Sequence, residues 1–309
     1  MEMVPWKDIC DCDVADKKCL ALFRDGLRRW KEHAVGTDGH SIQNQIWALL
    51  WDDAVFRTFN EARRLHIKTR DPSTGYYGTV IRLLDKSFVT CQVMAIRRLM
   101  DRHHHDPCRA VVSLPTIMAE IEEATQLHTR ENYVCYDGTP YTDKQATDED
   151  VRAIVRWRHR NYDLLAGCSD AKRSRSDRIR PDVFASLNRD HREFEILQTY
   201  ANKYLAHAAD PDNMRNAQDV PSQVSFRKFD ECYRALFGIA SAVGVLIDEC
   251  IPCMVPVPSY DQLNDWDKPI VTTADRDKLR QYWHDRAGEI DRWGEEAKFE
   301  NREQPGNRT

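Results

Sequence analysis

The chain has 309 residues, of which 41% are hydrophobic and 31% are charged, so it can bury a large core and is too apolar for general disorder. Its formal net charge of -5 excludes a global basic field and leaves only a local patch for a polyanion. The most apolar run, Leu236 to Ile247, is shorter than the about 20 residues of a membrane span. The acidic first residues are not typical of an export signal, so we expect a cytoplasmic protein with ten reduced cysteines and no membrane partner.

The first half of the chain predicts long amphipathic helices. A short helix is expected over 17–33, before a Gly-Thr-Asp-Gly turn. Ser41 can cap a long helix, and a second long helix covers about 77–102. Because only a short turn separates these two, we expect them to form an antiparallel hairpin. Ser113 then caps a helix over 114–124.

The second half continues in the same way, with two polar interruptions. A loop is expected over 131–145, and Thr147 with Asp150 resembles a capping box for the helix that follows. A basic segment, Lys172 to Arg180, predicts a loop that is either solvated or in contact with a phosphate backbone. The remaining helices are expected over 151–165, 183–208, 223–250 and 272–298.

This pattern predicts an all-α protein. Glycine and proline are few, at 12 and 13 residues, and alternating strand patterns are nearly absent. With no internal repeat and no clear linker, we expect one main domain. The predicted ranges are an N-terminal extension with a short helix over 1–40, a single helical domain over 41–298 and a flexible tail over 299–309.

The segment Tyr200 to Asp210 carries the strongest candidate for chemistry. Its apolar residues form one helix face and leave Asn202, Lys203 and His207 nearer the polar side. An imidazole titrates near neutrality and suits proton transfer, while an amide and an ammonium group can orient a phosphate. The ordinary alternative is that His207 only caps the end of its helix.

Three segments resemble HEPN domains, and more narrowly the HEPN family related to the phage abortive-infection protein AbiU2. They are Ile96 to Asp101, Val112 to Pro115 and Ala201 to His207, and the similarity in order and spacing extends over about 40–295. The resemblance implies an elaborated HEPN-like helical bundle with long antiparallel helices. It also implies a metal-independent ribonuclease of a defence or toxin system that acts as a homodimer on RNA without a cofactor.

The resemblance also assigns roles to residues. His207 would be the general acid or base for attack of a ribose 2′-OH on the adjacent phosphate, and Asn202 would orient the scissile group. Ala201 stands where the family has an arginine, so the cation would have to come from elsewhere. Lys203 is one source, although its point charge lacks the two-pronged geometry of a guanidinium.

Arg97 and Arg98 are the other candidate cations, on the condition that the fold brings their helix beside His207. Their ordinary interpretation is a salt-bridged helix surface.

Two non-catalytic hypotheses for the whole protein stay open. One is a HEPN-like module that has lost catalysis and binds RNA, a nucleotide or a protein partner; the other is a helical scaffold that resembles HEPN proteins only in architecture.

Two further clusters have the composition of metal sites, but we expect no metal. His103 to His105 are consecutive, and neighbouring residues of a helix point about 100° apart, so three cannot face one ion. Cys250 and Cys253 have CxxC spacing without the preceding strand of a redox site. A zinc site would need further thiols from the N-terminal cysteines.

Overall fold

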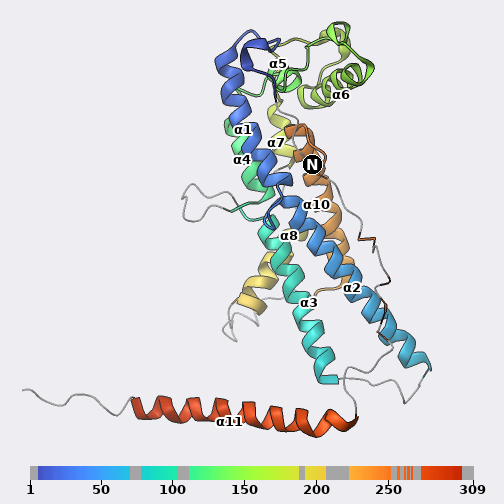
Figure 1. Cartoon of the computed structure of the whole chain (residues 1–309), viewed down its shortest axis with the longest axis vertical. Coiled ribbons are helices and arrows are strands. Elements are labelled where there is room, and N and C mark those ends of the chain that lie inside the picture. Colours follow the sequence, from blue (N-terminus) through green and yellow to red (C-terminus); the bar gives the residue numbers. More distant parts are fainter. Residues whose placement is uncertain are drawn as a thin grey trace, which may run out of the picture. The chain divides into compact units, whose positions relative to one another are not determined.

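The computed structural model describes residues 6–69, 78–102, 111–187, 192–206, 223–251, 256–257, 261, 263–264, 266 and 273–300. All regular elements in these ranges are helices, which confirms the all-α prediction (Figure 1). Their only β-type pairing is an isolated bridge between Thr129 and Arg178. The chain divides into two compact units, Met1–Pro256 and Val257–Thr309, which we describe separately as unit 1 and unit 2.

The described residues of unit 1 form long and short helices. Its α-helices are α1 (Lys17–Val35), α2 (Ile42–Thr69), α3 (Gly78–Leu99), α4 (Leu114–Glu123), α5 (Arg130–Cys135), α6 (Glu149–Ala166), α7 (Pro181–Leu187), α8 (Arg192–Tyr200) and α10 (Phe226–Ile247). Shorter elements are the 3-10 helices η1 (Ile9–Asp11), η3 (Asp143–Gln145) and η4 (Asp170–Lys172), and the π-helix η5 (Ala201–Ala206).

Side-chain caps begin several of these helices, as the sequence predicts. The Ser113 hydroxyl accepts a hydrogen bond from the Thr116 N–H at 3.2 Å, which satisfies one of the free donors at the start of α4. For α6 the cap is Asp148 and not Thr147, because the Asp148 carboxylate accepts from the Val151 N–H at 2.8 Å. The predicted loop over 131–145 was wrong in part, since α5 and η3 lie within it.

The helix α1 lies in the core of unit 1. Its side chains Leu20, Phe23 and Leu27 are fully buried, and Trp30 donates its indole N–H to the Glu120 carboxylate of α4. The helix α1 belongs to unit 1, which extends to Pro256.

The helices α2 and α3 form the expected antiparallel hairpin (Figure 1). Phe56 stacks on Phe88 with ring centroids 3.9 Å apart, and Arg63 forms an ion pair with Asp85 at 2.7 Å. Nearer the start of α2, the Gln92 amide of α3 donates to the Leu49 carbonyl at 3.2 Å. These contacts fix the register of the two helices along their length.

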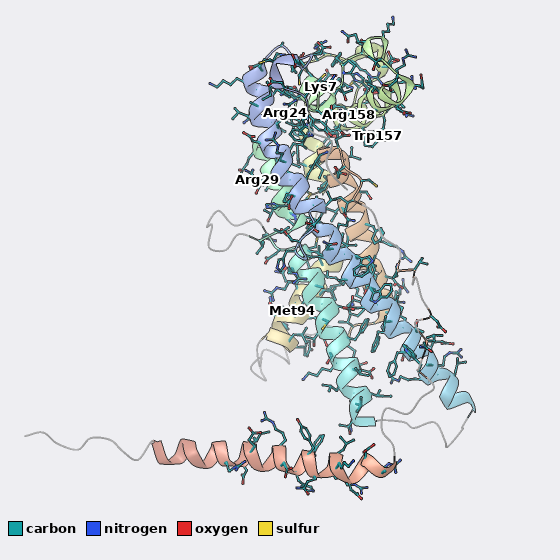
Figure 2. All side chains as sticks on the ribbon, viewed as in Figure 1. Lys7, Arg24, Arg29, Met94, Trp157 and Arg158 are labelled. Carbon is teal, nitrogen blue, oxygen red and sulfur yellow. The ribbon has the colours of Figure 1, made fainter. Side chains whose placement is uncertain are left out.

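The apolar residues of α3 lie on two faces of the helix. The face that carries Ile81, Phe88, Val93, Ile96 and Leu99 is buried in unit 1. On the outer side Val80, Leu83, Leu84 and Met94, which the sequence pattern groups with the buried residues, are exposed; Met94 is labelled in Figure 2. The hairpin therefore presents an apolar outer surface to solvent.

A buried ion pair joins α6 to the end of α10. The Arg158 guanidinium of α6 donates to the Asp248 carboxylate at 2.7 Å, and their side chains are 6% and 3% exposed. Asp248 ends α10 in the left-handed conformation, with φ 53°. The Tyr136 hydroxyl donates to Asp248, and Arg158 also pairs with Asp137 at 2.8 Å. Burial opposes ionisation of Asp137, but the Arg158 hydrogen bonds and charge outweigh it and hold the pKa of that carboxyl well below its usual value.

The regular elements in the described part of unit 2 are one long helix and a short lead-in. The 3-10 helix η6 (Thr273–Asp275) is followed by α11 (Arg276–Glu300), which confirms the helix predicted over 272–298. The rest of the predicted tail lies outside the described residues. No helix in the described parts of either unit has both the length and the apolar character to cross a membrane.

Replacing Asp248 by Asn should lower the free energy of unfolding by about 3 kcal/mol, because it leaves the buried Arg158 charge without its closest partner. Asn tolerates the left-handed conformation, so the loss reports the charge and not backbone strain. Urea unfolding followed by circular dichroism measures it. The control is Asp230→Asn, whose partly exposed pair with Arg57 should cost under about 1 kcal/mol. Equal losses in the two variants would contradict the role of the buried pair.

Candidate functional site

The helix that carries the candidate motif changes its winding at the motif. The α-helix α8 ends at Tyr200, and the chain continues as η5, whose wider π-type turn is uncommon and is frequent at functional sites. Ala201, at the position of the family arginine, is 0% exposed. Asn202 is exposed and Lys203 is half-buried. His207 follows η5 directly and lies outside the described residues.

A cleft lies between the C-terminal end of α3 and α8. Its empty volume is about 400 Å³, including the part open to solvent. The α3 side supplies residues Ile96, Arg97, Met100, Asp101 and Arg102, and the α8 side supplies Phe194, Leu197 and Gln198. An arginine predicted to bind substrate and the helix that leads into the motif therefore line one cleft.

The cleft is apolar at its base and polar at its edge. Ile96 and Leu197 are each 1% exposed and belong to the core of unit 1. Arg97 is half-buried, while Arg102 and Gln198 are exposed. A concave site of apolar residues with a few polar groups around it is the usual composition of a ligand site.

The two candidate arginines have different surroundings. The Arg98 guanidinium donates to the Gln45 amide oxygen of α2 at 2.8 Å, which directs it to the hairpin and away from the cleft. The Arg97 side chain lines the cleft and forms no hydrogen bond or ion pair with the described residues. The structure therefore brings Arg97, and not Arg98, to α8.

The predicted site residues Asn202 and Lys203 do not line the cleft. They lie on η5, against which α3 also packs.

The end of α3 is tied to the start of α4. The Ser113 hydroxyl donates to the Asp101 carbonyl at 2.7 Å, and the Asp101 carboxylate accepts the Arg102 N–H at 3.0 Å. The bond from Ser113 joins two of the three segments on which the HEPN resemblance rests, and the packing of α3 on η5 adds the third. Segments separated by about a hundred residues thus meet around one helix end.

The basic segment Lys172 to Arg180 is folded against carboxylates. Arg173 forms an ion pair with Asp163 at 2.6 Å, and Arg175 forms one with Glu131 at 2.6 Å. Their positive charges are therefore largely neutralised within unit 1, which leaves less charge for a phosphate backbone than the sequence indicates.

The metal-like clusters contribute no site to the described part of the chain. No group of three or more histidine, cysteine, aspartate or glutamate side chains could hold an ion there. Cys250 is an exposed free thiol, and Cys253 lies outside the described residues, as do His103 to His105.

Comparison with known proteins gives no neighbour: no protein-family model, no curated protein and no solved structure matches this chain. The interpretation of the site therefore rests on its geometry and on the resemblance described above.

The sequence predicted Arg97 as a substrate-binding residue but did not predict the rest of the cleft. Phe194 and Leu197 are apolar residues of a helix, and nothing in the sequence pattern distinguishes them from ordinary core residues. The cleft forms only because α3 packs on α8, and that contact joins helices far apart in the chain.

The different surroundings of the two arginines predict different costs of removal. Arg98→Ala should lower the free energy of unfolding by about 1 kcal/mol, because it removes the hydrogen bond to Gln45. Arg97→Ala should change it by less than about 0.5 kcal/mol, since no described partner is lost. Urea unfolding of the two variants provides the measurement. A larger loss for Arg97→Ala would mean that this arginine serves the fold.

Proposed function

We propose that this protein is a HEPN-type, metal-independent ribonuclease of a defence or toxin system, and that its RNA lies along the α3–α8 cleft. The observation that carries the proposal is Arg97, whose guanidinium lines the cleft beside the helix that leads into the motif and has no hydrogen-bond or ion-pair partner among the described residues. Unpaired cations beside a concave apolar surface are suited to phosphate groups.

The proposed reaction is cleavage by the neighbouring ribose. The 2′-oxygen forms a bond to phosphorus while the bond from phosphorus to the 5′-oxygen breaks, leaving a cyclic phosphate. His207 takes the 2′-OH proton as general base or gives a proton to the leaving 5′-oxygen as general acid. Asn202 orients the phosphate, and Lys203 stabilises the charge that develops on it.

A second candidate function is RNA binding without cleavage. The observation that favours it is Ala201, which is completely buried and supplies no cation where the family has an arginine. In this alternative the chain is a HEPN-like module that binds RNA, a nucleotide or a protein partner. The two functions share the cleft and differ in whether the bond to phosphorus is broken.

The deciding experiment is cleavage of a mixed tRNA and mRNA pool in the presence of EDTA. The first function predicts products with cyclic phosphate ends, and a loss of about 100-fold or more in His207→Ala. Arg97→Glu should weaken RNA binding, whereas Lys172→Glu, the same charge change in the basic segment, should not. Binding without cleavage by the unmodified protein would support the second function. No binding of RNA would contradict both RNA-based proposals.

The homodimer is part of the same proposal. Val55 and Leu65 of α2 and Leu83, Leu84 and Met94 of α3 are exposed on the hairpin. Exposed apolar surfaces of this kind commonly mark an interface, and in a two-fold dimer each copy offers the same surface to the other. A second copy covering the hairpin would remove these side chains from water.

Leu83→Glu should convert a dimer into a monomer, because it places a charge in the covered apolar surface. Light scattering after size-exclusion chromatography at tens of micromolar measures the mass. Leu164→Glu on α6, where the leucine is also strongly exposed, is the matched control and should leave the dimer intact. A monomeric unmodified protein, or a dimer that persists in Leu83→Glu, would contradict this interface.

A further inference from the structure

The edge of the α3–α8 cleft combines a carboxylate with two cations. Asp101 lies between Met100 and Arg102 just after the end of α3, and Arg97 lies one helical turn earlier. A simple anion would be attracted by Arg97 and Arg102 but repelled by Asp101. The combination instead fits a ligand with both an anionic group and hydrogen-bond donors.

The base of the cleft suits a flat apolar ring. Phe194 and Met100 are half-buried and line the cleft together with the buried Ile96 and Leu197. Aromatic side chains stack on nucleobases, and a thioether makes favourable contacts with aromatic rings. A nucleotide therefore matches the cleft in both of its parts, the ring and the phosphate.

The carboxylate selects among the bases. Asp101 uses one oxygen to accept the Arg102 N–H at 3.0 Å, and neither oxygen has a side-chain donor among the described residues. A carboxylate accepts hydrogen bonds and donates none. Guanine presents two donors side by side, its ring N1–H and its 2-amino group. Cytosine and adenine each present an amino group beside an acceptor atom, and uracil presents one N–H between two acceptor atoms. A carboxylate repels these acceptor atoms, so it binds the three other bases less well than guanine.

We propose that the α3–α8 cleft is a base-selective subsite for an unpaired guanine. Asp101 accepts its two donors, Phe194 and Met100 contact its ring, and Arg97 and Arg102 bind the adjacent phosphates. This inference rests on the proposed RNA function and adds the identity of the base that the cleft selects.

The test is binding of fluorescein-labelled RNA pentamers by anisotropy. AAGAA should bind about tenfold more tightly than AAAAA, the discrimination expected of one good two-pronged contact. A pentamer with inosine at the centre, which lacks the 2-amino group, should fall between them. Asp101→Asn should reduce the preference for AAGAA to less than about twofold while AAAAA still binds. Glu122→Gln, which removes an exposed carboxylate from α4, should keep the full preference.

The outcomes separate this inference from the proposed function. If both pentamers bind equally, or if Asp101→Asn keeps the preference, the guanine subsite is wrong and RNA binding stands. If the unmodified protein binds no RNA, the proposed function fails, and titration of the full-length protein with GMP and AMP decides the subsite alone. GMP bound in preference to AMP, with the preference lost in Asp101→Asn, would support the subsite; no preference would overturn it.

Discussion

The ion pair between Arg158 and Asp248 holds α10 in place. The packing of the rest of unit 1 depends on the position of α10. The ion pair holds the C-terminal end of α10 against α6, with both charges almost completely removed from water. Such a pair is stable only because Asp137 and Tyr136 supply further hydrogen bonds, since isolated buried charges are costly. A break in this network would therefore loosen the end of α10 from α6.

Hydrogen bonds from α10 in turn position the hairpin of α2 and α3. The Tyr233 hydroxyl of α10 donates to the Gln92 amide oxygen of α3 at 2.7 Å, and the Gln92 amide in turn donates to α2. These two hydrogen bonds fix the rotation of α3 about its axis and how closely it packs against α10 and α2. Because Arg97 follows Gln92 by five residues on the same helix, the same bonds determine which side chains reach α8.

The core near the end of α10 also contains an uncharged histidine. His128 is fully buried, and burial lowers its pKa to about 4, so the ring is neutral at neutral pH. Its Nε2 lies 2.7 Å from the Leu246 carbonyl, which can only accept, so this nitrogen carries the hydrogen. The end of α10 thus combines a buried ion-pair network around Arg158 with a hydrogen bond from a neutral histidine.

Most helices of unit 1 could be predicted from the sequence because apolar spacing and caps act locally. The start of α4 at Ser113 and the hairpin of α2 and α3 are examples. The six-residue α5 was missed because it is too short for a periodic pattern. Pairs such as Arg175 with Asp13, 162 residues apart, could not be predicted, since nothing local links them.

The cleft was predictable only in part for the same reason. Arg97 and Arg98 could be chosen as candidate cations, but the different roles of the two arginines depend on Gln45, which lies on another helix. Likewise, Leu83 and Met94 fit an apolar helix pattern, and only the packing shows that they face outward. Helix periodicity identifies apolar faces, whereas tertiary contacts decide which of them is covered.

The most direct test of the account is to map where RNA touches the protein. RNA containing 4-thiouridine would be crosslinked to the full-length protein with ultraviolet light, and the modified peptides would be identified by mass spectrometry. RNA bound in the α3–α8 cleft should crosslink to the segments that line it, Ile96 to Arg102 and Phe194 to Gln198. Crosslinks confined to other surfaces, such as Lys172 to Arg180, would contradict the assignment of the α3–α8 cleft as the RNA site.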